Sequence, residues 1–158
     1  MAFIQDADRG RLEQRFEDEL SGRVTLQLFT TPRYGLYVPG REECVTCADA
    51  EALLTEVAEL SPQLTLTKHD LYAEPEMAAA AGVDKVPALV LRGANGEPDG
   101  RVRFFGLPSG YEFATLVDSI IAVSKGTPSL RATTLERLET ALAGTDERLH
   151  LQVFVTPT

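Results

Sequence analysis

"REECVTCADAEALL", residues 41–54, holds the only two cysteines of the chain, at the point where a loop becomes a strongly helical run. Cys44 and Cys47 are three residues apart, so their sulfurs on one helical turn are close enough to form a bridge. Three interpretations are open at this point: a structural disulfide, part of a metal site, or a redox pair. The sequence on either side of the pair decides how they rank.

The cysteine pair lies between a predicted strand and a predicted helix. "RVTLQLFT", residues 23–30, alternates as a strand does, and an apolar helical face runs from Cys44 to Leu60, where Pro62 ends it. A helix N-terminus lowers the pKa of a nearby thiol and raises its thiolate fraction. This position favours a redox pair, with Cys44 as the attacking nucleophile and Cys47, which the helix shields, as the resolving thiol.

The rest of the chain completes an α/β pattern. Hydrophobic periodicity and turn residues predict helices at 8–20, 74–81 and 108–124, and strands at 64–71, 86–92 and 101–106, the last two as a hairpin. A helix followed by βαβαββα predicts a three-layer α/β unit with a mixed central sheet. This order is that of the thioredoxin-like fold.

A second feature of the predicted site is the Val86-Pro87 bond at the start of the strand 86–92. X-Pro is nearly the only place where a cis peptide occurs, and proline cannot donate to a sheet ladder. If the bond is cis, the backbone of Val86 faces the Cys44 sulfur, and an extended peptide substrate can add a short strand there. A trans proline that simply begins an edge strand is the alternative.

Other interpretations of the cysteine pair have less support in the sequence. A zinc site needs four ligands, and besides the cysteines the chain offers only His69 and His150; an iron–sulfur cluster shared across a dimer has no positive signal. Inert helical cysteines also remain open, since Val45 and Thr46 lack the proline of many redox motifs. A buried side chain at the end of the strand 64–71 would be able to accept a proton from Cys47, although strand-end residues are usually solvated.

The C-terminal part of the chain repeats its beginning. "RLHLQVFVTP" at 148–157 matches "RVTLQLFTTP" at 23–32 in six of ten positions, and both follow an amphipathic helix. We therefore expect a thioredoxin/glutaredoxin-like unit at 1–126, and at 127–158 a helix and strand that open a truncated second unit. The predicted strand at 149–155 has an exposed apolar edge, so we expect it to pack on the first unit or to pair with another copy, giving a homodimer.

Composition excludes several classes of function. The 158 residues carry a net charge of −9, which repels a nucleic-acid backbone and an anionic membrane surface. The N-terminus is acidic and lacks a signal peptide or an apolar span, so we expect a cytoplasmic protein that neither binds nor crosses a membrane. Two cysteines are too few for a disulfide scaffold. No residue pattern calls for a metal or another cofactor.

Several stretches resemble a known family. The Cys44/Cys47 pair, "VPA" at 86–88, "RFFGLPSGYEF" at 103–113 and "LQVFVTPT" at the C-terminus are similar to the protein disulfide oxidoreductases of thermophilic archaea and bacteria, glutaredoxin-like proteins with two thioredoxin-fold units. The resemblance covers nearly the whole chain. It implies that Cys44 and Cys47 form a reversible disulfide and that Pro87 is the cis-proline.

The chain departs from this family in two ways. The loop from Thr31 to Glu43 is longer than the family's usual approach to the cysteines, which bears on access to Cys44. The second active site is missing, which implies reduced activity in any reaction that needs both units. Alkyl hydroperoxide reductase flavoproteins have an N-terminal module with the same two-unit plan, but they normally keep the redox pair in the second unit.

The sequence therefore predicts a thiol–disulfide oxidoreductase module, with Cys44 and Cys47 as catalytic residues and Val86 and Pro87 as substrate-binding residues. Its expected partners are protein or small-molecule disulfides, or an electron donor that resembles thioredoxin reductase. The alternative is a non-catalytic thioredoxin-fold interaction or scaffold module in which the two cysteines form a static disulfide.

Overall fold

The computed structural model describes residues 3–32, 39–40, 43–94, 101–127, 130–144 and 150–154. The chain divides into two units, Met1–Gly126 and Thr127–Thr158. The first unit contains four strands and four helices among its described residues: α1 (Asp6–Glu19), β1 (Val24–Thr30), α2 (Cys47–Glu59), β2 (Leu64–Asp70), α3 (Pro75–Ala81), β3 (Ala88–Gly93), β4 (Arg103–Phe105) and α4 (Tyr111–Lys125). These elements follow the predicted order.

The four strands form one mixed sheet in the order β2-β1-β3-β4. β1 pairs in parallel with β2 and antiparallel with β3, and β3 forms the predicted antiparallel hairpin with β4. β1 is thus an interior strand, which explains why its alternating sequence pattern is buried on both faces. Its carboxyl end, the amino end of β3 and the start of α2 all belong to one edge of the sheet, because the β1-α2-β2 crossover returns α2 antiparallel to β1.

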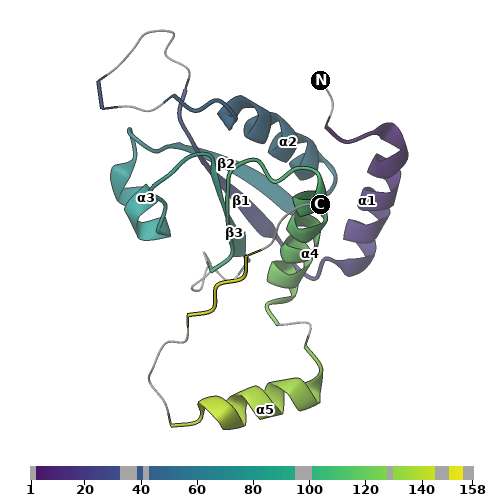
Figure 1. Ribbon diagram of the computed structural model, residues 1–158. Coiled ribbons are helices and arrows are strands. Elements are labelled where there is room, and N and C mark those ends of the chain that lie inside the picture. Colours follow the sequence, from purple (N-terminus) through teal and green to yellow (C-terminus); the bar gives the residue numbers. More distant parts are fainter. Residues whose placement is uncertain are drawn as a thin grey trace. The chain divides into compact units, whose positions relative to one another are not determined.

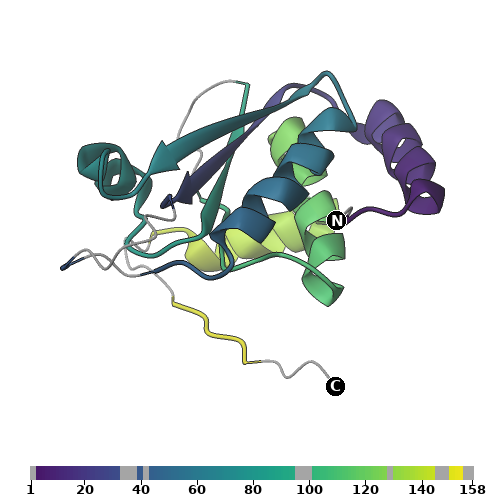
Figure 2. The same ribbon diagram turned by 90° about the horizontal axis from the view of Figure 1, so that it is seen from above.

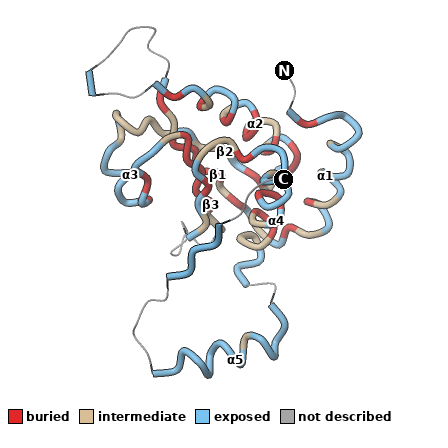
Figure 3. The backbone as a smooth tube through the Cα atoms, in the orientation of Figure 1, coloured by how far each residue is buried: buried red, intermediate tan, exposed pale blue. Residues whose placement is uncertain are grey.

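Helices cover both faces of this sheet, so the predicted three-layer α/β fold is confirmed. α2 and α4 lie on one face and α3 lies on the other, as Figures 1 and 2 show together. Two apolar clusters lie at the two interfaces. Figure 3 shows buried residues along the sheet strands and along the helices that cover them. Adjacent residues of one strand point to opposite faces, so Leu28 joins the cluster under α2 and α4 while Phe29 packs against α3.

The predicted end of α3 is confirmed. Gly82 has φ 67°, a left-handed conformation, and its N–H donates to the carbonyl oxygen of Ala79. A side chain at this position is disfavoured twice, since a Cβ atom would also lie 3.0 Å from the guanidinium of Arg103. That guanidinium donates through Nε to the Ala81 carbonyl oxygen at 2.7 Å, which ties the end of α3 to β4.

Several element boundaries differ from the sequence prediction, and three of them bear on the site. α2 begins at Cys47 rather than at Cys44, and β3 begins at Ala88 rather than at Val86. Pro87 cannot donate a ladder hydrogen bond, so pairing starts one residue later, where Ala88 lies opposite Phe29. β4 is a three-residue strand instead of the predicted six, and the turn that leads to it lies outside the described residues.

The second unit contains the expected helix, α5 (Ala132–Leu142), which buries none of its residues. The predicted strand is wrong for the part of it that the structure describes, since residues 150–154 have no secondary structure. Leu151, Val153 and Phe154 are 83–89% exposed. A strand is stabilised only when a neighbouring strand takes up its N–H and C=O groups, and local apolar alternation does not supply that neighbour.

The N-terminal segment is anchored to α2 by one carboxylate. Glu56 accepts hydrogen bonds from the backbone N–H of Phe3, at 3.0 and 3.1 Å, and from that of Ile4 at 2.9 Å. These two N–H donors hold the pKa of Glu56 below its usual value of 4.5. The ionised carboxylate therefore stabilises the folded chain, fully above the ordinary pKa and progressively less as the pH falls through the lowered one.

This anchor gives a pH-dependent prediction. At pH 7, Glu56→Gln is expected to lower the free energy of unfolding by about 1 kcal/mol, because glutamine keeps an acceptor but loses the charge. The difference from the unmodified chain should shrink below about pH 4.5, where Glu56 itself becomes protonated in the unfolded chain. Urea unfolding at several pH values measures it, with the exposed Glu59→Gln as a matched control on the same helix. A difference independent of pH would contradict this account.

Candidate functional site: a disulfide at the start of a helix

Cys44 and Cys47 are joined by a disulfide, with an S–S distance of 2.02 Å and Cα atoms 5.4 Å apart. The prediction that the two sulfurs can bridge is therefore confirmed. The structure describes the oxidised form of the pair, in which neither sulfur is a thiol. No group of three or more metal-ligating side chains occurs among the described residues.

The helix α2 begins at the second cysteine of the pair and not at the first. Cys47 is the first residue of α2 and Thr46 is its N-cap, with the Thr46 carbonyl oxygen accepting from the Ala50 N–H at 2.9 Å. Cys44 lies in the non-helical segment that precedes α2, and its disulfide joins it to the first residue of the helix. The disulfide thus lies at the N-terminus of α2, where the helix dipole favours a thiolate in the reduced form.

Both cysteines are buried, but unequally. Cys44 is 8% exposed and Cys47 is 3% exposed, whereas Val45 between them is 73% exposed. The order agrees with the expectation that the first cysteine is the more accessible one. The difference in exposure is small, so Cys44 is also largely shielded from solvent in the disulfide form.

The Val86-Pro87 peptide bond is cis, as the resemblance implied. The Pro87 carbonyl oxygen accepts from the Gly106 N–H at 2.9 Å, which fixes the turn against the end of β4. Val86 is half-buried and packs against the apolar cluster between the sheet and α3. Pro87 immediately precedes β3, and it therefore lies at the same edge of the sheet as the start of α2 and the disulfide.

The polar residues at the end of β2 have structural partners. Lys68 pairs with Glu51 at 2.8 Å, and the ring of His69 is 2.8 Å from a carboxylate oxygen of Glu74. The hydrogen bond with His69 is the main reason why the pKa of Glu74 lies below its usual value. These contacts connect β2 to α2 and to the N-cap residue of α3, so the side chains of Lys68 and His69 both have structural partners.

One buried polar group at this edge was not anticipated. The Thr31 hydroxyl, directly after β1, is the buried side-chain oxygen without a hydrogen-bond partner among the described residues. Nothing in the sequence marked it, since a threonine before a proline at a strand end is ordinarily a solvated turn residue. Its burial results from tertiary packing.

The fold and the disulfide together define a class: a thioredoxin-like α/β protein with a CxxC disulfide at the start of its second helix. Among solved structures, the N-terminal domain of the alkylhydroperoxide reductase AhpF from Enterococcus faecalis (V583) has 26% sequence identity and a TM-score of 0.71. A second AhpF structure from that organism has 26% identity and a TM-score of 0.70. A protein disulfide oxidoreductase from Aeropyrum pernix K1 has 21% identity and a TM-score of 0.68, and shares the fold.

Both kinds of protein named from the sequence are therefore structural neighbours of this chain. The matches cover 86%, 87% and 88% of this chain, but only 60%, 60% and 57% of the two AhpF structures and the disulfide oxidoreductase. The chain thus spans about three fifths of the length of these neighbours. No protein-family model and no curated protein sequence matches it.

No helix in the described part of the chain is both long and apolar enough to cross a membrane.

Proposed function

We propose that this chain is a thiol–disulfide oxidoreductase module, which exchanges its Cys44–Cys47 disulfide with the thiols or disulfides of protein or small-molecule partners. The single observation that carries the proposal is the disulfide itself, which joins the first residue of α2 to Cys44, three residues earlier. A dithiol in this position is close enough to re-form its bond and lies where a helix N-terminus favours the thiolate. The structural neighbours make the same chemistry reasonable for this fold.

The exchange consists of two displacements. In the reduced module, the Cys44 thiolate attacks a substrate disulfide, forms a mixed disulfide and releases one substrate thiolate. The Cys47 thiolate then attacks the Cys44 sulfur, which releases the second substrate thiolate and forms the Cys44–Cys47 disulfide. Two electrons pass from the module to the substrate, and the reverse sequence oxidises a substrate dithiol. Cys44 takes the attacking role because it lies outside the helix and is the less buried of the two.

We assign substrate binding to the backbone at Val86 and Pro87. Pro87 has no N–H for the sheet ladder, so β3 begins only at Ala88, and both residues lie at the edge of the sheet at which α2 begins. An extended peptide beside Val86 would hydrogen-bond to the backbone as an added strand.

The partners follow from this chemistry. They are disulfide-bearing proteins or small molecules, and an electron donor that resembles thioredoxin reductase, in the cytoplasm. The unit Thr127–Thr158 is proposed to be the opening of a second thioredoxin-like unit, on the strength of its sequence repeat and of α5. The exposed apolar residues at 151–154 favour pairing of two copies through this segment.

A second candidate function is a scaffold in which the disulfide is static. The observation that favours it is the burial of both sulfur-bearing residues, at 8% and 3% exposed. Burial slows attack by an external thiol, and a disulfide that is never opened would act only as a covalent link between α2 and the segment before it.

A redox titration distinguishes the two functions. The chain is equilibrated in glutathione buffers of graded potential, and the fraction of Cys44–Cys47 disulfide is read by thiol alkylation and mass spectrometry. For an oxidoreductase we expect a reversible two-electron transition with a midpoint between about −270 and −120 mV, the range of thioredoxin-fold proteins. A pair that stays oxidised at every potential in this series would overturn the proposal and leave the scaffold.

A further inference from the structure

The charged residues next to the disulfide are acidic. Glu43 directly precedes Cys44, and Asp49 lies in the first turn of α2, two residues after Cys47. Both carboxylates belong to exposed residues, and neither forms an ion pair with another described residue. The cysteine pair thus has one exposed negative charge on each side of it along the chain.

The same sign continues along the edge of the sheet that holds the disulfide. β1 and β2 end at this edge, and α2 and α3 begin there, as Figures 1 and 2 show from two directions. Glu76, in the first turn of α3, is a further exposed acidic residue without an ion pair in the described part of the chain.

The lysines near this edge have carboxylates beside them. Lys68, toward the end of β2, pairs with Glu51 of α2 at 2.8 Å. Lys85 lies in the segment before the cis bond and follows Asp84 in the chain. Each lysine is therefore matched by one acidic residue, and neither offsets the carboxylates that flank the disulfide.

The loop before Cys44 does not reverse this balance. Residues 33–38, 41 and 42 lie outside the described part of the chain, and by sequence they carry two arginines and one glutamate. Their net charge of one positive unit is smaller than the combined negative charge of Glu43, Asp49 and Glu76.

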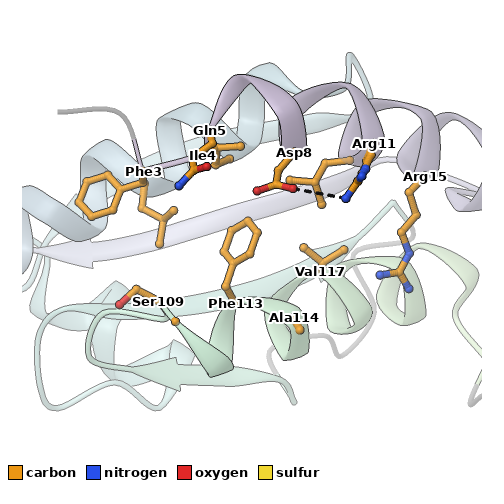
Figure 4. A pocket seen from close by; sticks show the side chains of 13 residues that line it. Phe3, Ile4, Gln5, Asp8, Arg11, Arg15, Ser109, Phe113, Ala114 and Val117 are labelled. Carbon is orange, nitrogen blue, oxygen red and sulfur yellow. Dashed lines mark ion pairs between the residues drawn. The ribbon is translucent and has the colours of Figure 1, made fainter.

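The groove between α1 and α4 shows a different distribution of charge. Arg11 lies 3.8 Å from Asp8 there (Figure 4), and Arg15 donates to Asp118 at 2.7 Å. Because its charges of opposite sign are mixed, this groove does not favour a ligand of either charge. The edge with the disulfide holds an excess of one sign next to a reactive bond.

This excess acts on the exchange reaction itself. When the Cys44 thiolate attacks a disulfide, one negative charge becomes shared among three sulfur atoms. The Cα atoms of Glu43 and Cys44 are about 3.8 Å apart, well inside the screening length of about 8 Å at physiological ionic strength. The neighbouring carboxylates repel the shared charge, and positive groups on the substrate offset this repulsion and accelerate the encounter.

From this distribution we propose that the disulfides exchanged by this chain are flanked by lysine or arginine in an extended peptide segment. The inference rests on the proposed function and adds the charge of the substrate to it. Cations on the two sides of the substrate disulfide would lie near Glu43 and Asp49, while the peptide backbone pairs with that of Val86. Acidic residues in the same places would be repelled.

Three disulfide-linked peptide dimers test this proposal. They share the sequence Ala-Xaa-Cys-Xaa-Ala with blocked termini, where Xaa is lysine, glutamine or glutamate. The full chain is reduced, freed of reductant and mixed with each dimer, and the loss of its thiols is followed by alkylation and mass spectrometry. Each rate is divided by the rate at which dithiothreitol, an uncharged dithiol, reduces the same dimer, which corrects for the different leaving groups.

The expected order of normalised rates is lysine, then glutamine, then glutamate. We expect a ratio of about tenfold between the lysine and glutamate dimers at about 20 mM salt, and of less than about twofold at about 1 M salt, where the charges are screened.

Charge variants assign the ratio to the two flanking carboxylates. Glu43→Gln and Asp49→Asn should each lower it about twofold, and the double variant about fourfold. Glu59→Gln removes the same charge from an exposed position at the other end of α2 and should leave the ratio unchanged. A change in the reactivity of Cys44 alone cancels in the ratio, and thermal melting checks the fold of each variant.

The outcomes separate this proposal from the proposed function. Exchange at equal normalised rates with all three dimers, or a ratio that the double variant does not change, would overturn the charge preference and leave the oxidoreductase. Exchange with none of them would overturn both. Cystamine, a small diammonium disulfide, and the uncharged hydroxyethyl disulfide form a further pair. A preference for cystamine without one for the lysine dimer would show that the substrate is a small molecule and overturn the peptide substrate.

Discussion

Cys44→Ser is expected to lower the rate of disulfide reduction by about a thousandfold or more, because a serine hydroxyl at neutral pH cannot replace a thiolate nucleophile. Insulin reduction or a mixed-disulfide dye assay measures this rate. Cys44 is nearly buried, so the substitution leaves the surface almost unchanged, and circular dichroism should show the same secondary structure.

Cys47→Ser is expected to give a different result, because the first displacement remains possible and the second does not. The Cys44 thiolate should form a mixed disulfide that no second cysteine resolves, so the substrate adduct accumulates. Intact-protein mass spectrometry detects the added mass, which a reducing agent should remove. The Cys44→Ser chain under the same conditions is the matched control and should carry no adduct.

The two variants together assign the roles of the cysteines. An adduct on Cys47 in the Cys44→Ser chain, with none in the Cys47→Ser chain, would mean that the roles are reversed. Full turnover by both variants would show that the disulfide takes no part in the reaction. Either result would contradict the mechanism given above, whereas loss of helical structure would trace the effect to folding.

The largest stability effect is expected in the core, at Leu54. Leu54 lies in the middle of α2, is 0% exposed and belongs to the cluster that α2 and α4 form with the sheet. Leu54→Ala is expected to lower the free energy of unfolding by about 3 kcal/mol or more, from lost apolar burial and from the cavity left behind. Urea unfolding followed by far-ultraviolet circular dichroism measures the change.

Leu138→Ala makes the same substitution where little is buried. Leu138 lies on α5 and is 44% exposed, and alanine is the better helix former, so its effect should stay within about 0.5 kcal/mol. If both substitutions cost the same, the burial of Leu54 would not be the cause of its effect. If Leu54→Ala cost less than about 1 kcal/mol, the packing described for α2 would be wrong.

Much of the first unit could be predicted from local patterns. The alternation of 23–30 and the apolar face of 108–124 each identify an element to within about three residues, because burial repeats with the period of the backbone. The glycine at 82 marks the end of α3, since it has the conformation that residues with a side chain avoid. The cysteine spacing predicts that a bridge can form.

The details of the site required the assembled structure. The start of α2 depends on how the segment from Cys44 to Thr46 reaches the helix, and periodicity says nothing about residues that precede the first turn. No local sequence pattern marks the burial of Cys44 or of the Thr31 hydroxyl. Single-sequence patterns identify which residues prefer burial, but not which groups will be left without a partner.

The repeat at the C-terminus shows the same limit. "LQVF" at 151–154 differs from "LQLF" at 26–29 in one residue, yet the first is exposed and irregular while the second is an interior strand. The sequence by itself determined the order of the elements, their apolar faces and the ability of the two cysteines to form a disulfide, because these depend on residues close together in the chain. Only the tertiary structure decided which strand finds neighbours and that α1 and α4 leave a groove, because both depend on where distant segments lie.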